Sequence, residues 1–348
     1  MDTRPDFRQS RPQVAQQSIS KPKHDMKKSN SLRFLGNSHL LQMAAAAGIL
    51  GLSSSAFAAL TITPTFTAGF NTAFGANAAA AQAAWISAAN VLSANFNDNI
   101  HINITVNGVA GTGVFGQSST FLNSTTYANL RNKVVADAKS ADDATAIGAG
   151  GSMTVADPTA GAGTWWVSRA QAKAIGLIAD DLSNDGTTTF GAGNPFTFAG
   201  PIAAGTYDFQ GIAGHEISEV MGRLGISGGT IGSFPNSYSL IDDFSYTGVG
   251  SKGLGNGAGN NFSIDAGTTL LKLWNNAVAN GLDSRDWAPG SNDSYNQFSG
   301  PGVVNPVTGV DIRLMDVIGY DLVPEPTTGT LLVAAATIGA VLRRRKQS

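Results

Sequence analysis

The stretch from Phe209 to Gly225 constrains the fold more strongly than any other part of the chain. Its apolar residues recur at intervals of three and four, as on the buried face of a helix. They are Phe209, Ala213, Ile217, Val220 and Leu224. Asp208 stands where an N-cap is expected, and Gly222 and Gly225 can end the helix. The sequence therefore predicts an amphipathic helix with one face against a core.

The polar face of this predicted helix gathers most of the chain's scarce reactive side chains. Residues 59–322 contain only two glutamates and two histidines, and His215, Glu216 and Glu219 fall within five positions. At about 100° per residue, His215 and Glu219 project about 40° apart. Imidazole nitrogen and carboxylate oxygen both suit zinc, so this pair predicts a metal site. Glu216 is then free to act as general base on a metal-activated water.

These residues carry a resemblance to known enzymes. His215-Glu216-Ile217-Ser218-Glu219 resembles the HExxH helix of zinc metallopeptidases, the zincins, with Glu219 in place of the second histidine. Gly222 matches the glycine of the longer metzincin pattern HExxHxxGxxH, while Gly225 stands at its third histidine. The closer resemblance is to bacterial zincin-like metalloproteases that bear a PEP-CTERM tail. The shared segments, spread over most of residues 65–322, are HEISEVMGR (215–223), a D-F-x-Y segment (242–246), FSID (262–265) and LMDVIGYD (314–321).

The resemblance implies an α+β, zincin- or metzincin-like fold over residues 59–322. Such a fold has a mixed sheet with an edge strand beside the active-site helix, and here a loop-rich C-terminal half. It also implies a zinc-dependent endopeptidase acting on a protein or peptide substrate. The alternative is a catalytically inactive zincin-like surface or extracellular-matrix protein, because two of the three usual ligands are changed. Retention of Glu216 favours hydrolysis, since a structural metal needs no general base.

Hydrophobic periodicity and turn residues predict the other elements. Helices are expected over residues 76–94, 127–140, 268–279 and 313–320, strands over 99–106, 187–190 and 194–198, and a loop over 141–163. Residues 165–177 are ambiguous, and a short helix is favoured there. The strand at 187–190 and its partner at 194–198 would place an edge strand just before the helix. His101, on the polar side of the strand at 99–106, is expected to be solvated rather than a ligand.

Catalytic zinc requires a third protein ligand. Neither histidine nor glutamate remains for this role, so an aspartate is expected. Asp242 is the first choice, because it lies in a short apolar segment at the position that the resemblance marks. Asp243 and then Asp265 are alternatives. An aspartate in a loop rich in Gly and Asn is also typical of a turn or a Ca²⁺ ligand, so calcium is a possible second metal.

Two further roles follow from the comparison with zincins. Tyr246, or Tyr238, could donate a hydrogen bond to the tetrahedral oxyanion. Met315 invites comparison with the metzincin methionine turn, although a methionine in an apolar helix is usually part of a core. A di-iron carboxylate bundle is excluded, because it needs four glutamates on four helices. A serine hydrolase is unsupported, since the chain has no G-x-S-x-G motif.

Charge and cysteine content limit the partners. The chain has no cysteine, so any metal must be held by nitrogen and oxygen ligands. Residues 59–322 carry ten basic and twenty acidic residues. This net negative charge disfavours nucleic acid as a partner and suits an exported, soluble domain.

The two ends predict export. Residues 1–25 are polar and lack a periodic apolar pattern, so they are expected to be disordered. Alternatively, translation starts at Met26 and these residues are not part of the protein. Residues 26–58 have the basic, apolar and small-residue order of a Sec signal peptide, the alternative being an N-terminal membrane anchor. Residues 323–348 contain Pro-Glu-Pro, a short apolar transmembrane stretch and a basic tail, and resemble the PEP-CTERM sorting signal that an exosortase cleaves. An ordinary tail anchor is the alternative.

These signals together predict a transient membrane anchor through the C-terminal segment. After processing, the mature domain is expected in the periplasm, on the outer surface or in the extracellular matrix of a Gram-negative bacterium.

Overall fold

The computed structural model describes residues 60–275 and 283–324. The expected disordered start and signal peptide lie outside these ranges, as does the sorting signal beyond Pro324. None of the helices within the described ranges has the length and apolar character needed to cross a bilayer. The described structure is a mixture of helices and several small sheets.

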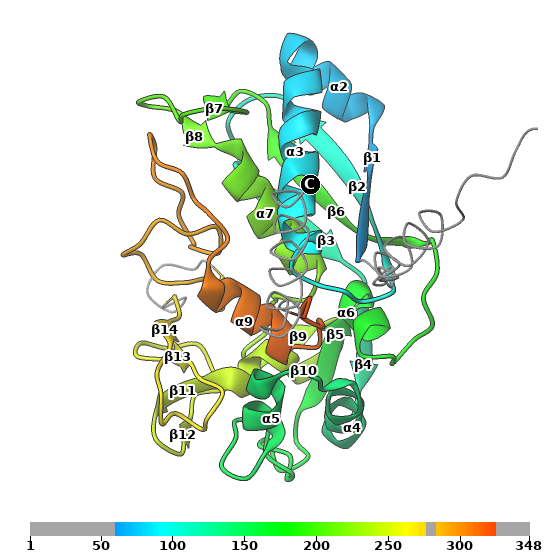
Figure 1. The fold of residues 1–348 in the computed structure, drawn as a ribbon, viewed down its shortest axis with the longest axis vertical. Coiled ribbons are helices and arrows are strands. Elements are labelled where there is room, and N and C mark those ends of the chain that lie inside the picture. The colour runs from blue at the N-terminus through cyan, green and yellow to red at the C-terminus, as the bar shows by residue number, and fades with distance from the viewer. Residues whose placement is uncertain (1–59, 276–282, 325–348) are drawn as a thin grey trace, which may run out of the picture. The chain divides into compact units, whose positions relative to one another are not determined.

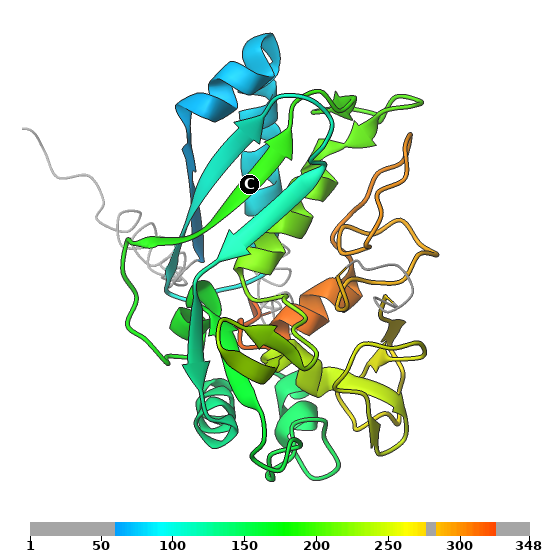
Figure 2. The ribbon, with the colours of Figure 1, turned by 180° about the vertical axis from the view of Figure 1, so that it is seen from behind.

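A four-stranded sheet with the order β1-β2-β6-β3 forms the framework behind the predicted site helix (Figures 1 and 2). Strands β1 (Thr61–Phe66), β2 (His101–Val109) and β6 (Asn184–Gly191) are parallel. Strand β3 (Gly116–Thr120) is antiparallel to β6 and forms one edge. Residues of β2 alternate between buried and half-buried, as its period-two sequence predicts, so this strand prediction is confirmed.

Helices α3 (Ala78–Ser93) and α7 (Phe209–Val220) pack against each other on one face of this sheet (Figures 1 and 2). The short helix α2 (Ala68–Phe74) and the 3-10 turn η1 (Gly75–Asn77) precede α3. The ring of Phe209, at the start of α7, contacts four other phenylalanines, namely Phe74, Phe190, Phe196 and Phe198. This aromatic core joins the first turn of α7 to both the sheet and α2.

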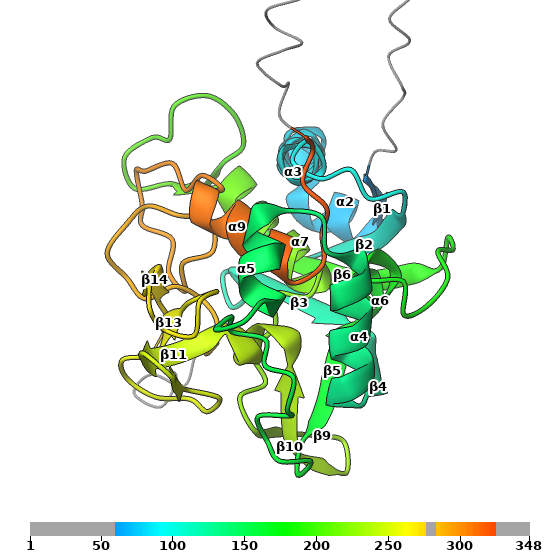
Figure 3. The ribbon, with the colours of Figure 1, turned by 60° about the horizontal axis from the view of Figure 1, so that its bottom comes forward.

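The rest of the described chain is built from short elements. A second sheet has the order β4 (Leu122–Thr125), β5 (Thr164–Ser168), β10 (Phe234–Ser239) and β9 (Gly229–Ile231). A third has the order β12 (Ser251–Lys252), β11 (Ser245–Gly248), β13 (Asn261–Phe262) and β14 (Lys272–Leu273), and β7 (Phe196–Thr197) pairs with β8 (Tyr207–Asp208). The remaining helical elements are α4 (Tyr127–Asp137), α5 (Ala141–Ile147), α6 (Arg169–Ala174), η2 (Leu240–Phe244) and α9 (Gly309–Val317). In Figure 3, α5 and α9 lie next to each other.

The last described residues pack against the turn that follows α3. Leu322 forms a β-bridge with Phe96, and the amide of Val323 donates to the carbonyl of Asn95 at 2.9 Å. The amide of Asn97 donates to the carbonyl of Asp321 at 2.9 Å. The segment that follows α9 therefore closes the domain by pairing with the turn after α3.

Several predicted elements are confirmed and others are wrong. The predicted helices at 76–94, 127–140 and 313–320 correspond to α3, α4 and α9. The predicted loop at 141–163 begins with α5, whose start is fixed by a capping box on Ser140. The predicted helix at 165–177 is half strand, because Trp165, Trp166 and Val167 belong to β5. Residues 272–273 of the predicted helix at 268–279 form β14, and its residues 276–279 lie outside the described ranges.

The edge strand beside α7 is β3, not the strand at 187–190. That segment forms β6, which lies inside the sheet between β2 and β3. The predicted partner at 194–198 pairs with β8 instead. The sequence of β3, Gly-Gln-Ser-Ser-Thr, has no apolar alternation, because neither of its faces belongs to the core. A strand of this kind gives no periodic signal.

Candidate functional site

Helix α7 is oriented by its apolar face. Phe209, Ala213, Ile217 and Val220 are completely buried, as the predicted stripe requires. Asp208 is the N-cap residue, but its carboxylate accepts the amide of Asn305 at 2.9 Å instead of capping the helix. The helix stops before Gly222, whose φ of 120° is unfavourable for residues with a side chain.

A cleft of about 690 Å³ opens along the polar face of α7. Its first wall comes from α7 and β3, and its second wall from loop residues 283–286 and 296–299. The lining residues are Phe115, Gly116, Gln117, Ser118, Tyr207, Ile212, His215, Glu216, Glu219, Arg223, Leu224, Gly225, Asp283, Arg285, Asp286, Asn296, Gln297, Phe298 and Ser299. All three residues singled out on the predicted helix therefore face one cavity.

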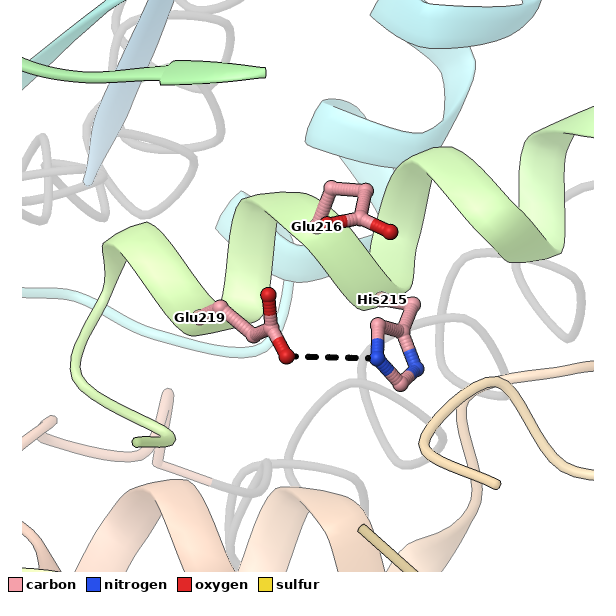
Figure 4. Close-up of side chains that lie close together, drawn as sticks. All are labelled: His215, Glu216 and Glu219. Atoms are coloured by element: carbon pink, nitrogen blue, oxygen red, sulfur yellow. Dashed lines mark ion pairs between the residues drawn. The ribbon is translucent and has the colours of Figure 1, made fainter. Parts of the chain in front are cut away.

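His215 is held so that one ring nitrogen faces two carboxylates. Its Nδ1 lies 2.9 Å from the carbonyl oxygen of Ser294, which can only accept, so Nδ1 carries the proton and donates. Its Nε2 lies 3.3 Å from Oε1 of Glu219 (Figure 4) and 3.5 Å from Oδ1 of Asp286. A histidine that binds a metal typically donates its other N–H in this way, which fixes the ring and its tautomer.

Two of the three separations between these donor atoms are close to the edge length of a tetrahedral zinc site. Ligand atoms at zinc distances of 2.0–2.1 Å in tetrahedral geometry lie about 3.3–3.4 Å apart. The contacts of Nε2 with Glu219 and Asp286 match this edge length. Ligand atoms of Glu219, Asp283 and Asp286 also lie within 4.8 Å of one another, as do those of His215, Glu216 and Glu219. His215, Glu219 and Asp286 do not together form either of these groups, so only the two contacts of Nε2 relate this donor set to the geometry of a zinc site.

Glu216 lines the cleft beside Glu219 and also packs against the edge strand β3. In Figure 4 its carboxylate points to a different side of the helix from theirs. A Cβ atom on Gly116 would collide with Oε1 of Glu216, so this glycine makes room for the carboxylate. Glu216 is only 6% exposed. Burial first, and then the neighbouring Glu219 carboxylate, raise the pKa of Glu216 well above its usual range, so the protonated form is favoured in the absence of a metal.

Glu219 is oriented by the edge strand. The hydroxyl of Ser118 donates to its Oε2 at 2.6 Å, which leaves Oε1 facing His215. Burial acts to raise the pKa of Glu219, but the hydrogen bond and charge of His215 and the charge of Arg223 outweigh it and lower the pKa to about 2. Glu219 is therefore a carboxylate at any physiological pH.

The charges around His215 are those of a site that favours a cation. Burial and the charge of Arg223 act to lower the pKa of His215, but the carboxylates of Asp286 and Glu219 outweigh them and raise it to about 9. Burial and the same two carboxylates raise the pKa of Asp283 to about 6. Without a metal, the His215 ring is therefore protonated at neutral pH and pairs with these carboxylates as a cation, and a metal at Nε2 would have to replace that proton.

Arg223 is the arginine of the HEISEVMGR segment and is buried at the end of the cleft. Its guanidinium pairs with Oδ1 of Asp286, donates to the hydroxyl of Ser218 at 2.8 Å and lies 3.6 Å from Oε1 of Glu219. Its charge also lies over the ring of Tyr295, 4.5 Å from the centroid. Arg223 therefore fixes Asp286 against α7 and offsets part of the negative charge.

Asp242, the expected third ligand, lies elsewhere, and that expectation is wrong. Its carboxylate is completely buried and accepts from Nε of Arg285 at 2.8 Å and from the amides of Ser227 and Ser239 at 2.9 and 2.8 Å. It belongs to neither group of possible metal ligands within the described ranges. Asp242 instead ties the segment after α7 to Arg285, the residue next to Asp286.

The aspartates considered as alternatives also face other partners. Asp243 is buried and pairs with Lys252 and with the hydroxyl of Tyr127 at 3.0 Å. Asp265 accepts from the hydroxyl of Ser263 and from the amide of Thr269, both at 2.8 Å. Neither lines the cleft. Asp286, which was not predicted from the sequence, is the aspartate that lies beside Nε2 of His215. It lies in an irregular segment without periodicity, and its only sequence signal is the adjacent tryptophan, a residue that needs a core.

Neither expected oxyanion donor faces the cleft. Tyr246 is 2% exposed and donates to the carbonyl of Ser152 at 3.0 Å, and Tyr238 packs against Trp165 with ring centroids 5.6 Å apart. Tyr207, which was not anticipated, does line the cleft. Met315 is completely buried.

His101, the other histidine of the domain, lies away from the cleft. Its ring is 46% exposed and pairs with Asp180 at 2.7 Å, as expected for a solvated strand histidine.

Comparisons of the chain with family profiles, with curated proteins and with solved structures found no match.

Proposed function

We propose that this domain is a zinc-dependent endopeptidase. The observation that carries the proposal is the setting of His215: Nδ1 is anchored on a backbone carbonyl, and Nε2 faces two carboxylate oxygens at the edge lengths of a zinc tetrahedron. His215, Glu219 and Asp286 would hold the metal, with Asp286 in the place first expected of Asp242. The resemblance of residues 215–223 to zincin-like metalloproteases supports the same reading.

Each residue of the first wall has a part in the proposed reaction. A bound zinc would supply a Lewis acid that polarises the peptide carbonyl and acidifies water. Glu216 would take a proton from the attacking water and pass it to the departing amine. Strand β3 ends the sheet, so one of its edges is free of other strands, and residues 115–118 line the cleft. An extended peptide can add to this edge through main-chain hydrogen bonds.

The expected signal peptide and sorting signal also suggest where the endopeptidase would act. Export through Sec and cleavage by an exosortase would place the endopeptidase in the periplasm, at the cell surface or in the matrix. No structural observation bears on those segments, because they lie outside the described residues.

A catalytically inactive surface protein is the second candidate, and one observation favours it. Arg223 already pairs with Asp286, so the cleft carboxylates have a protein cation beside them. In that case the cluster would be a buried ionic network that organises the two walls without a metal. The two candidates differ in whether the purified protein takes up zinc.

The deciding experiment combines metal analysis with one conservative substitution. The purified protein should bind one zinc per chain, and Glu216→Gln should retain it while peptide hydrolysis falls by about 10²- to 10⁴-fold. Equal hydrolysis by Glu216→Gln and the unaltered protein would exclude the proposed role of Glu216. Absence of zinc uptake at micromolar concentration would favour the inactive surface protein.

A further inference from the structure

A second, smaller cavity lies at the start of α7 and is called the second pocket below. Its volume is about 240 Å³, and its walls come from α3, the loop between β7 and β8, the first turns of α7, Ser294 and residues 304–307. None of the described residues lines both this pocket and the cleft. The volume is that of about eight water molecules, and drug-sized ligands occupy about 300–1,000 Å³. The second pocket therefore suits a compact molecule.

Most of the second pocket is apolar. The apolar side chains come from three separate segments of the chain and are Val91, Phe198, Ile202, Val304, Pro306 and Val307. The ring of Phe198 packs against those of Phe209 and Phe74, with centroids 5.1 and 6.1 Å apart. This wall is therefore joined to the aromatic core. An apolar wall that is already held in place by packing binds an apolar group without first having to be ordered.

Asn305 brings an unpaired hydrogen-bond donor to the second pocket. It lines the pocket and is 2% exposed, and its amide nitrogen Nδ2 is buried with no hydrogen-bond partner in the described structure. Its side chain starts against the first turn of α7, since a Cβ atom on Gly211 would lie 2.9 Å from Cβ of Asn305. Buried N–H groups are almost always paired, because an unpaired one has lost its contact with water and gained nothing in return. An acceptor oxygen on a ligand would supply the missing partner.

The start of α7 adds a second preference for an acceptor oxygen. Gln210 and Gly211 belong to its first turn and line the pocket, and the N-cap residue Asp208 forms no side-chain hydrogen bond to that turn. The N–H groups of a first turn carry the positive end of the helix dipole. Asp208 is the only charged residue among those that line the pocket, and its carboxylate accepts the amide of Asn305 at 2.9 Å. Because this negative charge disfavours an anion, the acceptor that fits is an uncharged carbonyl oxygen.

Ser294 lies between the second pocket and the candidate metal site. It lines the pocket, where its hydroxyl donates to the carbonyl of Gly211 at 2.7 Å and its amide donates to the carbonyl of Pro306 at 2.9 Å. Its own carbonyl accepts Nδ1 of His215 at 2.9 Å. A ligand in the second pocket would therefore contact the residue that anchors His215 without entering the cleft.

We infer that the second pocket is a binding site for a compact, uncharged molecule with an apolar body and one carbonyl oxygen, which accepts from Nδ2 of Asn305. Ketones, esters, lactones and small amides have this chemistry. The inference goes beyond the proposed endopeptidase and is independent of it, because it uses no residue that lines the cleft and requires no metal.

Three probes of nearly equal shape test the inference on the purified, metal-free protein. They are acetophenone, α-methylstyrene, in which a methylene group replaces the carbonyl oxygen, and benzoate, in which a carboxylate replaces the acetyl group. NMR titration of the protein amides gives each Kd and identifies the residues whose signals shift. Acetophenone should bind about tenfold more tightly than α-methylstyrene and more tightly than benzoate, with the largest shifts at Gly211 and Asn305. Equal Kd values of the ketone and the alkene, or shifts confined to the cleft, would overturn the inference.

Two substitutions separate the hydrogen bond from the shape of the second pocket. Asn305→Leu replaces the amide with an apolar group of similar size, so acetophenone should lose its advantage over α-methylstyrene while both still bind. Val304 lines the pocket and is 55% exposed, so Val304→Trp should fill the opening and weaken both probes by about tenfold or more. Val249→Trp, at a residue that is 75% exposed and lines neither cavity, should leave both Kd values unchanged.

The substitutions can also contradict the inference. A retained preference for the ketone in Asn305→Leu would show that Nδ2 is not the donor, and equal binding to both tryptophan variants would place the probes outside the second pocket. Neither titration depends on hydrolysis or on zinc. The inference can therefore fail while the proposed endopeptidase stands, and a protein without peptidase activity can still bind the ketone.

Discussion

Two regions of this domain bring several acidic side chains together, most of them buried, and the negative charge is balanced differently in each. One is the cleft, with Glu216, Glu219, Asp283 and Asp286 around His215. The other is named here the closing cluster, with Asp98, Asp137, Asp316 and Asp321, where the last described residues pack against the turn after α3. Burial is the first cause that raises the pKa of Asp98, Asp137 and Asp316, each to about 7, and Asp321 adds to it in all three.

The closing cluster is balanced by protons and one lysine. Lys139 pairs with Asp321, and the amide of Asp321 donates to Asp98 at 3.0 Å. Within the described ranges, no three ligand atoms of this cluster approach within 4.8 Å of one another, and it contains no histidine. The cleft differs because an anchored imidazole nitrogen faces two carboxylates there, which is the arrangement on which the proposed zinc site rests. Crowded acids alone therefore do not predict a metal site, whereas an oriented ligand set does.

The largest effect should come from the histidine that only the cleft possesses. His215→Ala removes the sole imidazole ligand and should weaken zinc binding more than a hundredfold, beyond the 10- to 100-fold typical of supporting residues. His101→Ala removes the other histidine of the domain and should leave zinc affinity unchanged. Competition with a chromogenic chelator measures both. Equal affinity of the two variants would place the metal outside the cleft.

The third ligand can be tested with a matched pair of aspartates. Asp286→Asn should weaken zinc binding by about 10- to 100-fold, because an anionic donor is replaced by a neutral amide. Asp242→Asn should lower the free energy of unfolding, since it leaves Arg285 buried without its counter-charge. Its folded fraction should bind zinc like the unaltered protein. Loss of zinc affinity in Asp242→Asn, with Asp286→Asn unaffected, would reinstate the ligand expected from the sequence.

This pair also shows what the sequence could and could not predict. Helix α7 and its three reactive residues follow from a period of 3.6 and from the scarcity of histidine and glutamate, both of which are local properties. Asp286 lies 67 residues beyond Glu219 in a segment without periodicity, and only tertiary contacts with Arg223 bring it to the cleft. The apolar surroundings of Asp242 did not identify a metal ligand, because a buried aspartate can form an ion pair with an arginine as well as bind a metal.

The edge strand was missed for a similar reason. Strand β3 is polar on both faces, so its sequence resembles a loop, and its place beside α7 depends on pairing with residues 186–190. The positions of Gly116 and Ser118 against the two glutamates could not be inferred without that pairing. The long elements with a periodic apolar face were predictable, whereas β3, which carries only polar contacts, and the short buried strand β5 were not.

Ser118 provides a smaller effect within the cleft. Ser118→Ala removes the hydroxyl that fixes Oε2 of Glu219 at 2.6 Å, so this ligand loses its orientation. Zinc affinity should fall by about tenfold, the lower end of the range for residues that support a metal ligand. Ser119→Ala, on the exposed alternate position of the same strand, should change nothing. A Ser118→Ala protein with full affinity would show that Glu219 needs no support from β3.

The smallest expected effect tests the other side of the comparison, the closing cluster. The pKa of Asp98 is raised from 3.8 to about 7, first by burial and then by Asp321 and Asp137. The folded state therefore holds this proton more tightly than the unfolded state. Its contribution to stability is complete below pH 3.8 and is lost as the pH rises through about 7. Lys139, paired with Asp321, is the cation that faces this group.

Asp98→Asn should remove that dependence, because the amide cannot ionise while its oxygen can still accept the amide of Asp321. Between pH 6 and pH 7, the free energy of unfolding should shift in favour of the variant by about 1 kcal/mol relative to the unaltered protein. Urea unfolding at both pH values measures this shift. Asp181→Asn is the control, since hydrogen bonds from Arg169 and Ser183 lower the pKa of Asp181 to about 2 and keep it ionised throughout. If the free energy of unfolding of Asp98→Asn and of the unaltered protein changed equally with pH, Asp98 would be ionised in the folded state. The two acid clusters would then differ in geometry alone.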